Sequence, residues 1–294
     1  MHLFKDLTRR AAGLGGLVGG AALSMTVAGQ ALAQELNFIG EPHAGGIALQ
    51  EAHSPVSVTS HAIDHMLLYI IIAISVFVTG LMVWVVIRYN RRSNPTPSRF
   101  THNSPLEVAW TILPIFILIF IGAFSVPALF KDQTMPEADV TIKVTGYQWF
   151  WGYEYVDHGV EFSSYRLERD ELEAAGYEPR HYLLATDTQV VVPINRNVVL
   201  QITGGDVIHS WAMPAFGIKQ DGVPGRLAEA WFNVDEPGIY FGQCSELCGQ
   251  EHAYMPITVH AVTEEEYIAW LQEQGATNLA AAPGYTPAVE LASN

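Results

Sequence analysis

Two long apolar stretches dominate the hydrophobic pattern of this chain. They cover residues 67–87 and residues 108–130, and neither contains a charged residue. A helix of either length spans about 30 Å, the thickness of the hydrocarbon core of a bilayer. The pattern therefore predicts a transmembrane helix hairpin over residues 65–131, with a connecting loop over residues 88–106.

The beginning of the chain has the pattern of a signal peptide. A basic start with Lys5 and two arginines is followed by an apolar stretch that ends in small residues up to Ala33. A first transmembrane helix is the alternative, but the six glycines between positions 13 and 29 and the Ala-Leu-Ala ending argue against it. We therefore expect residues 1–33 to be removed and residues 34–64 to form an exported N-terminal segment.

The charges on either side of the first apolar stretch predict its orientation. The connecting loop holds four arginines and no acid, whereas residues 34–64 hold four acids and no lysine or arginine. Positively charged loops stay in the cytoplasm, so both mature ends are predicted to lie outside. Together with the signal peptide, this predicts a two-pass protein of a bacterial inner membrane whose soluble domain lies in the periplasm.

Short strand-like runs begin at Val140. Gly, Pro, Asp and Asn separate them, a spacing typical of an antiparallel sandwich or barrel. Residues 264–274 place apolar side chains at helical spacing after an acidic turn, which predicts a closing helix, and residues 275–294 are expected to be flexible. The soluble domain is therefore predicted over residues 132–274. The runs are TIKVTGYQWFWGYEY, HYLLAT, VVVPINRNVVLQIT, AEAWFNV, GIYFGQC and PITVHAV.

The exported part of the chain is strongly acidic. From residue 131 onward it contains 24 acidic and 8 basic residues, a formal balance of −16. Such a surface makes nucleic acid an improbable partner. Negative charge keeps an exported domain soluble, and it also steers a basic protein toward the surface at low salt. Composition alone leaves both interpretations open.

Both cysteines of the chain lie in the run GQCSELCGQEHAYMP. Cys244 and Cys248 are followed there by His252 and Met255. In an oxidising compartment a disulfide is the simplest interpretation of two cysteines, but it leaves the histidine and the methionine unexplained. The spacing favours a metal-binding loop, to which His209 in the run DVIHSWAMP could add a second imidazole.

The types of ligand favour copper. A structural zinc site of two thiolates and two imidazoles would leave Met255 unused, whereas copper accepts a weak thioether ligand. A mononuclear blue-copper site needs one cysteine, and this loop has two. Two thiolates can bridge two copper ions, each also bound by one histidine, so that a single electron is shared across a compact centre. Such a centre suits electron transfer.

Five motifs within residues 61–270 carry a family resemblance: EVAWTILP, GYQWFWGYEY, DVIHSWAMP, KQDGVPGR and GQCSELCGQEHAYMP. The chain resembles subunit II of the haem–copper cytochrome c oxidases. This implies a two-helix transmembrane hairpin plus an all-β cupredoxin-like sandwich or barrel that holds the binuclear copper centre CuA. It also implies that single electrons arrive from cytochrome c and pass to haem a of subunit I, where oxygen is reduced and protons are translocated.

The resemblance also assigns ligands residue by residue. The two cysteines would bridge the coppers, the methionine would be a weak axial ligand, and Glu246 would contribute its backbone carbonyl. The side chain of Glu246 would bind a magnesium or manganese ion at the border with subunit I, since carboxylates suit hard ions. An ordinary loop acid is the alternative for this side chain. The copper-ligating side chains would be His209, Cys244, Cys248, His252 and Met255.

Two further residues receive roles from the resemblance. Trp149 matches the point at which electrons enter in the family, although the sequence does not separate it from Trp151. Core packing is the interpretation for the other aromatic residues of GYQWFWGYEY. Glu107 matches the mouth of a proton uptake channel of subunit I, whereas physics alone equally favours an acid at a helix N-terminus.

Glu154, Asp187 and Asp206 match positions that receive lysines of cytochrome c in the family. This match favours steering over mere solubility as the role of the acidic surface. Ser163 stands where relatives often carry another acid, so the docking face could be weaker here, and the neighbouring Glu161 could compensate.

Three other functions compete with this interpretation. A copper-free quinol oxidase subunit has the same architecture, but the complete ligand set argues against it. Nitrous oxide reductase shares only the CuA module and needs a large propeller domain that 294 residues with a hairpin cannot hold. An exported copper-binding assembly protein could use the same soft ligands, but it would have little reason for the motif GYQWFWGYEY.

Overall fold

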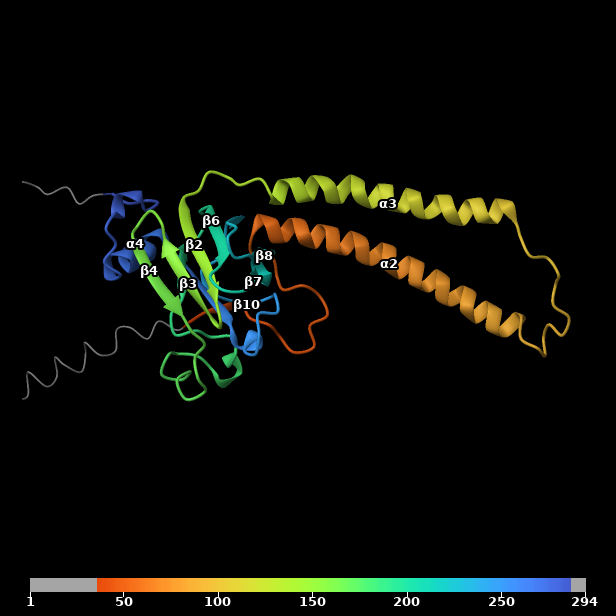
Figure 1. Cartoon of the computed structure of the whole chain (residues 1–294), viewed down its shortest axis with the longest axis horizontal. Coiled ribbons are helices and arrows are strands. Elements are labelled where there is room, and N and C mark those ends of the chain that lie inside the picture. The colour runs from red at the N-terminus through yellow and green to blue at the C-terminus, as the bar shows by residue number, and fades with distance from the viewer. Residues whose placement is uncertain (1–35, 287–294) are drawn as a thin grey trace, which may run out of the picture.

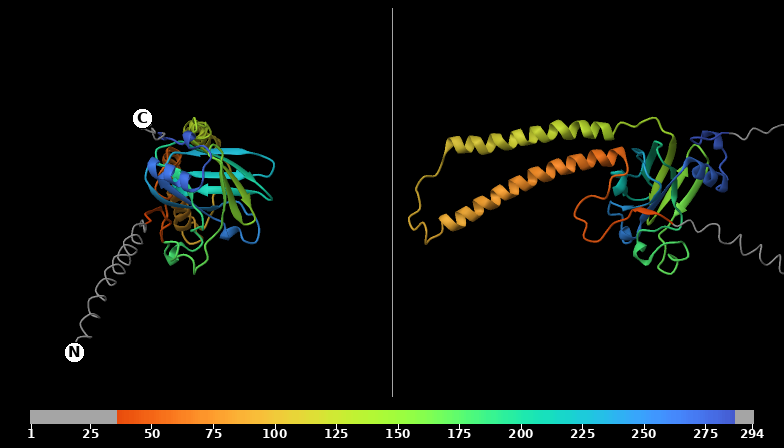
Figure 2. Two further views of the ribbon diagram at one scale, coloured as in Figure 1. Left: turned by 90° about the vertical axis from the view of Figure 1, so that its left-hand side faces the viewer. Right: turned by 180° about the vertical axis from the view of Figure 1, so that it is seen from behind.

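The computed structural model describes residues 36–286. The signal peptide predicted over residues 1–33 and the last eight residues of the tail lie outside this range. Within it, a long helix hairpin extends from one end of a β-sandwich (Figures 1 and 2). The hairpin and the sandwich follow each other in the order that the hydrophobic pattern predicts.

The hairpin consists of α2 (Pro55–Arg88) and α3 (Ser104–Asp132). Both helices are long and apolar enough to cross a membrane, by length and composition. Helix α2 begins twelve residues before the apolar stretch, because Ser54 accepts a hydrogen bond from the Ser57 N–H and proline occupies the first turn. Residues 55–64, assigned from the sequence to the N-terminal segment, are therefore helical.

The described strands form two sheets that pack face to face. The first has the order β5-β11-β10-β7-β8, with β1 also paired to β10, and the second has the order β4-β3-β2-β6-β9. The first sheet contains β1 (Phe38–Gly40), β5 (Val190–Pro193), β7 (His209–Met213), β8 (Ile218–Gly222), β10 (Gly238–Cys244) and β11 (Pro256–Val262). The second contains β2 (Val140–Tyr147), β3 (Phe150–Tyr155), β4 (Val160–Ser164), β6 (Val198–Gly204) and β9 (Ala228–Phe232).

The sandwich is mixed and not purely antiparallel, which corrects the sequence-based expectation. Strand β2 pairs with β6 in parallel, β5 with β11 in parallel, and β1 with β10 in parallel. The remaining pairs are antiparallel hairpins or neighbours, such as β2 with β3. The parallel pairs join strands that are far apart in the sequence, and strand spacing carries no signal for such pairs.

The core lies between the two sheets. Alternate residues of β2 and β3 point into it, including Ile142, Trp151 and Tyr155, all fully buried. Two hydrogen bonds cross the core: the Tyr155 hydroxyl donates to the Val191 carbonyl, and the Trp211 indole N–H donates to the Tyr153 hydroxyl. Buried polar atoms are costly unless they are paired, so these bonds fix one alignment of the two sheets.

Two segments differ from expectation. The run HYLLAT forms no strand; it begins with the last residue of the short 3-10 helix Pro179–His181 and belongs to a connection over residues 165–189. Its apolar side chains pack with that connection into a second cluster, so they gave a false strand signal. The cluster contains Leu167, Leu172, Tyr177, Ala185, Ile239 and Phe241, with Leu36, Phe38, Tyr182 and Leu184 packed against it.

The C-terminal part of the domain is more ordered than the sequence indicated. The closing helix is present as α4 (Glu264–Glu273), with a capping box between Thr263 and Glu266. The following residues, expected to be flexible, fold back onto the domain up to residue 286. Thr277 hydrogen-bonds to the His158 carbonyl, and Ala282 is buried.

Candidate metal centre

The cluster of sulfur and imidazole groups lies at one end of the first sheet. His209 is the first residue of β7 and Cys244 is the last residue of β10, and pairing of Cys244 with Trp211 brings the two strands together there. The loop after Cys244 carries Cys248 and returns to β11, where the Cys244 N–H donates to the Met255 carbonyl. Both ends of the metal-binding loop are therefore held by sheet hydrogen bonds.

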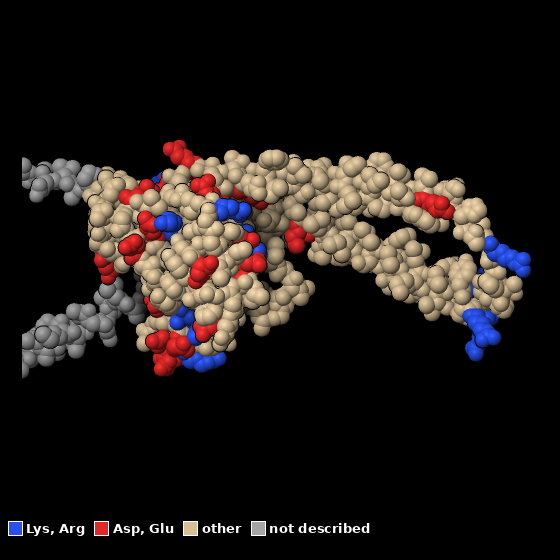
Figure 3. All heavy atoms as spheres, viewed as in Figure 1, with Lys and Arg blue, Asp and Glu red and all other residues tan. Residues whose placement is uncertain are grey.

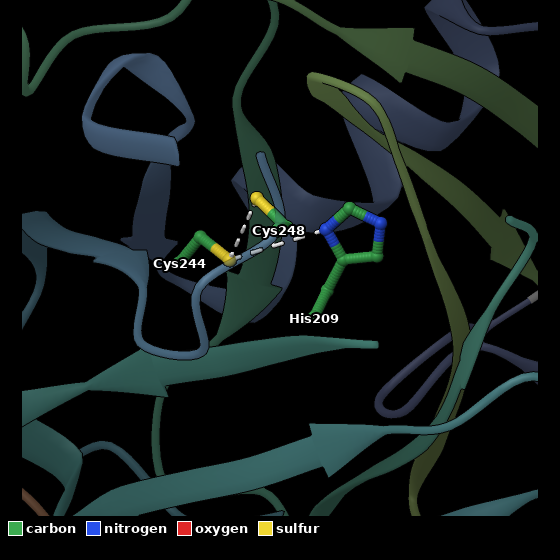
Figure 4. A group of neighbouring side chains, drawn as sticks. All are labelled: His209, Cys244 and Cys248. Carbon is green, nitrogen blue, oxygen red and sulfur yellow. Dashed lines mark hydrogen bonds between the residues drawn. The ribbon is translucent and has the colours of Figure 1, made fainter. Parts of the chain in front are cut away.

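The four chemical groups form two sulfur–imidazole pairs. The sulfurs of Cys244 and Cys248 lie 3.8 Å apart, well beyond the 2.05 Å of a disulfide bond, and both thiols are free. Nδ1 of His209 lies 4.0 Å from the Cys244 sulfur, and Nδ1 of His252 lies 3.6 Å from the Cys248 sulfur. Figure 4 shows the first histidine facing the two sulfurs from the neighbouring strand. The ligand atoms of His209, Cys244 and Cys248 all lie within 4.8 Å of one another.

Asp206 determines the orientation of His209. Its Oδ1 lies 2.8 Å from Nε2 of the imidazole, which leaves Nδ1 free to face the sulfurs. Asp206 also accepts hydrogen bonds from the backbone N–H groups of Gln148 and Val207. Burial opposes its ionisation, but these bonds outweigh burial and lower the pKa of Asp206. Asp206, a predicted docking residue for cytochrome c, thus also orients His209, a predicted metal ligand, and sequence reasoning missed this role although the two residues are three positions apart.

Met255 and Glu246 occupy different environments within the loop. Met255 is buried in the same apolar cluster as the two cysteines, so its thioether is kept from water on the core side of the site. The backbone carbonyl of Glu246 lies 3.4 Å from the Cys244 sulfur. The Glu246 side chain is partly exposed and does not belong to the group of His209 and the two cysteines, the one such group found among residues 36–286.

Ionisation of one thiol opposes ionisation of the other. Burial opposes ionisation of Cys244, but hydrogen bonds with His209 and with backbone groups of Ser210 and Glu246 lower its pKa to about 6. Burial and the adjacent Cys244 raise the pKa of Cys248 to about 12. A metal that binds both sulfurs would remove this repulsion, since metal ions deprotonate the thiols that coordinate them. Soft sulfur ligands combined with imidazoles fit copper.

The two tryptophans that the sequence could not separate have different surroundings. Trp151 is fully buried on β3, and its ring packs edge-on against His209. Trp149 lies in the turn between β2 and β3 and is partly exposed, and its indole N–H donates to the Cys248 carbonyl at 3.3 Å. Trp149 therefore connects solvent with the backbone of the metal-binding loop, whereas Trp151 supports His209 from inside the core.

The other predicted residues are not brought to the cluster. Glu154 pairs with Lys143 at 2.8 Å, and Asp187 accepts a hydrogen bond from the Tyr165 N–H. Glu107 lies in the first turn of α3, where it accepts a hydrogen bond from the Asn103 N–H. That turn is at the end of the hairpin remote from the sandwich (Figure 1). Glu107 and the sulfur cluster therefore lie at opposite ends of helix α3.

Comparison with known proteins decides the family. The family model described as cytochrome c oxidase subunit II, transmembrane domain, matches residues 42–128, and the one described as the periplasmic domain of the same subunit matches residues 140–262. The chain belongs to the cytochrome c oxidase subunit II family. It is thus a subunit of a haem–copper oxidase, an oxidoreductase, and its two apolar helices and cupredoxin-like domain confirm the predicted fold class.

Individual relatives of this subunit II extend over most of the chain. Cytochrome c oxidase subunit 2 of Cereibacter sphaeroides is 54% identical over 269 residues, which cover 87% of this chain and 89% of that protein. A probable cytochrome c oxidase subunit 2 of Rickettsia bellii is 42% identical over 248 residues, covering 84% and 91%. A crystal structure of the periplasmic domain of subunit II from Bradyrhizobium japonicum is 45% identical, covers 48% of this chain and 97% of that one, and has a TM-score of 0.44.

Proposed function

We propose that this subunit accepts single electrons from cytochrome c at a binuclear copper centre of the CuA type and passes them to haem a of subunit I. Oxygen reduction coupled to proton translocation takes place in that partner. The observation that carries the proposal is the pair of free thiols 3.8 Å apart, with one imidazole facing each sulfur. Two bridging thiolates with one terminal histidine per metal require this arrangement.

The residues of the site perform distinct tasks in this proposal. Cys244 and Cys248 hold the two coppers, His209 and His252 bind one copper each, and Met255 supplies a weak ligand from the apolar side. The bound copper pair supplies a one-electron redox couple with little change in geometry. The Glu246 carbonyl adds a further copper contact, and its carboxylate binds magnesium or manganese together with residues of subunit I.

Electrons arrive through Trp149 in this proposal. Its ring is partly exposed, and its indole N–H contacts the Cys248 carbonyl, so it lies between the surface and the metal-binding loop. Glu154, Asp187 and Asp206 contribute to the negative face that receives the basic donor. Asp206 and Glu154 also have partners within the chain, so their share in docking is smaller than that of unpaired acids.

The hairpin anchors this centre at the outer face of an inner membrane. The arginines of the connecting loop gather at the end of the hairpin remote from the acidic domain (Figure 3), which supports a cytoplasmic loop and a periplasmic domain. Glu107 then lies near the cytoplasmic surface, at the mouth of a proton uptake channel of subunit I.

The full-length chain in detergent, loaded with copper, tests the proposal. We expect two coppers per chain and one unpaired electron coupled about equally to both copper nuclei in electron paramagnetic resonance. The variant Cys248→Ser should lose this spectrum, because the centre would lose one of its two thiolate bridges. One copper per chain, or a Cys244–Cys248 disulfide that persists after reduction and reloading, would contradict the proposal and favour a copper carrier or a copper-free subunit.

A further inference from the structure

The two histidines of the metal centre are supported very differently. His209 is fully buried, begins a strand and has Nε2 held by Asp206. His252 is partly exposed and begins a three-residue 3-10 helix that has no side-chain capping bond. That short helix, His252–Tyr254, is held locally by the bond from the Tyr254 N–H to the Glu251 carbonyl. The His252 side of the centre therefore needs support from outside the metal-binding loop.

A stack of alternating arginine and tyrosine side chains reaches this turn from the connection between β4 and β5. The guanidinium of Arg169 lies 3.7 Å from the ring centre of Tyr182, and that of Arg166 lies 5.3 Å from the same ring. Arg166 also lies 5.4 Å from the ring centre of Tyr254. The arginine–tyrosine stack, Arg169–Tyr182–Arg166–Tyr254, thus ends two residues after His252 and directly before Met255 in the loop.

Arg166 is fixed at the centre of this stack. Its side chain is only 17% exposed, and its guanidinium forms two hydrogen bonds with the Glu168 carboxylate, at 2.7 and 3.0 Å. It also donates to the Tyr182 hydroxyl, and its backbone forms a β-bridge with Thr186. The guanidinium thus bonds the Glu168 carboxylate and the Tyr182 hydroxyl while it lies near the Tyr254 ring, a set of contacts that the single ammonium group of lysine cannot reproduce.

The base of the stack is itself rigid. The connection over residues 165–189 folds around the second apolar cluster, which includes the buried Leu167, next to Arg166, and the buried Ala185, three residues after Tyr182. The Leu167 N–H donates to the Ala185 carbonyl. In Figure 1 this connection is the green segment below the sheets. An ordered connection that contacts the loop through Tyr254 can hold the His252 turn in place.

We propose that Arg166 is a positioning residue for the metal centre, which through Tyr254 fixes the turn that carries His252. Arg166 would thus support His252 indirectly, as Asp206 supports His209 by a direct hydrogen bond. The inference rests on the proposed function, in that His252 is taken as a copper ligand. The contact depends on the planar guanidinium as well as on its charge, which Glu168 also pairs with at 2.7 Å.

Four variants of the full-length chain in detergent test this role. Arg166→Gln removes the guanidinium, and Arg166→Lys keeps the charge without the planar faces. Tyr254→Leu removes the ring, and Tyr254→Phe keeps it. The matched control is Arg180→Gln, which removes an arginine of the same connection that pairs with Glu41 and Glu178 and does not contact the loop.

The first measurement uses the metal-free chain, so it does not depend on which metal binds. Amide hydrogen exchange at Tyr254 should be about fivefold faster in Arg166→Gln, Arg166→Lys and Tyr254→Leu, the loss expected when a cation–π contact is removed. Tyr254→Phe and Arg180→Gln should exchange like the parent chain, and the amides of β11 should stay unchanged. If Arg166→Gln does not fold, Tyr254→Leu carries the test from the other side of the contact.

The second measurement uses the copper-loaded chain. The variants that lose the stack should release copper to a chelator about fivefold faster and show less equal coupling of the unpaired electron to the two coppers, because one histidine is less well held. Unchanged exchange at Tyr254 in Arg166→Gln would overturn the inference, and so would parent-like behaviour of Arg166→Lys, which would assign the effect to charge. A chain that binds no copper pair but shows the expected exchange would refute the proposed function and leave the positioning of the turn intact.

Discussion

Asp206 illustrates how one carboxylate can orient a predicted metal-binding histidine and still be partly exposed to solvent. Its side chain is about one-third exposed, yet it bonds the imidazole of His209 and two backbone N–H groups. The sequence predicts the candidate ligands, because four of them lie within twelve residues of one loop. The sequence could not show that Asp206 bonds to His209 or that Arg166 contacts Tyr254, since these contacts depend on which strands and loops become neighbours in the fold.

We expect Asp206→Asn to weaken copper binding about 10- to 100-fold, the usual effect of losing a carboxylate partner of a metal-binding histidine. Asparagine can still accept one backbone hydrogen bond, so the turn should survive while the imidazole loses its ionic partner. Competition with a chelator measures the affinity. Asp187→Asn is the matched control, because Asp187 also accepts a backbone N–H but contacts no ligand. Equal affinity of the two variants would contradict the role given to Asp206.

At the scale of elements, strand β2 leaves room for the His209 imidazole, because it has a glycine, Gly146, beside that ring. A Cβ added at Gly146 would lie 2.7 Å from Cγ of His209, closer than such atoms approach one another. In β3 of the same sheet, a Cβ added at Gly152 would lie no nearer than 3.3 Å to its closest neighbour, a ring carbon of Tyr147. Gly146 is therefore needed to make space for His209, whereas a side chain at Gly152 would come close only to the edge of the Tyr147 ring.

Gly146→Ala should displace the His209 imidazole and lower copper affinity by at least about tenfold, at a stability cost of about 1–3 kcal/mol from overpacking. Gly152→Ala should leave the copper spectrum unchanged. Copper titration and chemical unfolding of both variants separate the two effects. A normal spectrum and normal affinity in Gly146→Ala would show that β2 does not constrain His209.

His181 makes the stability of the connection between β4 and β5 dependent on pH. Burial lowers its pKa from an unfolded value of about 6.5, and its Nδ1 accepts the Glu178 N–H, which requires an unprotonated nitrogen. Below pH 6.5 the unfolded chain therefore binds a proton that the folded chain does not. This contribution to stability is fully present above that pH and is lost as the pH falls toward the lower folded pKa.

Chemical unfolding of the metal-free chain between pH 7.5 and 5.5 should show this loss, at most about 1.4 kcal/mol per pH unit for one proton. His260, whose pKa burial also lowers, adds to it in the same direction. His181→Gln should flatten the pH dependence, whereas His43→Gln, at an exposed position, should not. An unchanged slope in His181→Gln would assign the pH dependence to other groups.

The elements that the sequence predicted well are those whose signal is local. The two transmembrane helices follow from apolar length, and α4 follows from its acidic first turn and helical spacing. The prediction of a strand over the run HYLLAT was wrong, because its apolar residues pack into the second apolar cluster within a loop. The expectation of a flexible tail did not hold up to residue 286, because Thr277 bonds to His158, more than a hundred positions earlier, and Ala282 packs into the core.

At the scale of the whole molecule, charge is divided between the two ends. Acidic residues are scattered over the visible face of the sandwich and outnumber the basic ones there, and the arginines of the connecting loop gather at the far end of the hairpin (Figure 3). From residue 131 onward the formal balance is −16. A domain of this charge attracts a basic electron donor over distances comparable with the screening length, about 10 Å at 0.1 M salt.

We therefore expect electron transfer from a basic cytochrome c to the assembled oxidase to slow by about tenfold or more as salt rises from low to well above physiological strength. Stopped-flow oxidation of reduced cytochrome c measures the rate. Glu161→Gln, at an exposed position next to the partly neutralised Glu154, should slow the reaction at low salt and leave it unchanged at high salt. A rate that is independent of salt would contradict steering and would favour solubility as the role of the acidic surface.

The parallel pairing of β1 with β10 links the maturation of this protein to its insertion into the membrane. Phe38 pairs with Ile239, so a strand made before the hairpin completes a sheet made after it, and Phe38 also covers the second apolar cluster. A chain that has crossed the bilayer once still has these two strands on opposite sides. Strand β1 can therefore join the first sheet only after both helices have been inserted. A fragment that starts at Lys131 would lack β1 and expose an edge of β10 that the intact chain never presents to solvent.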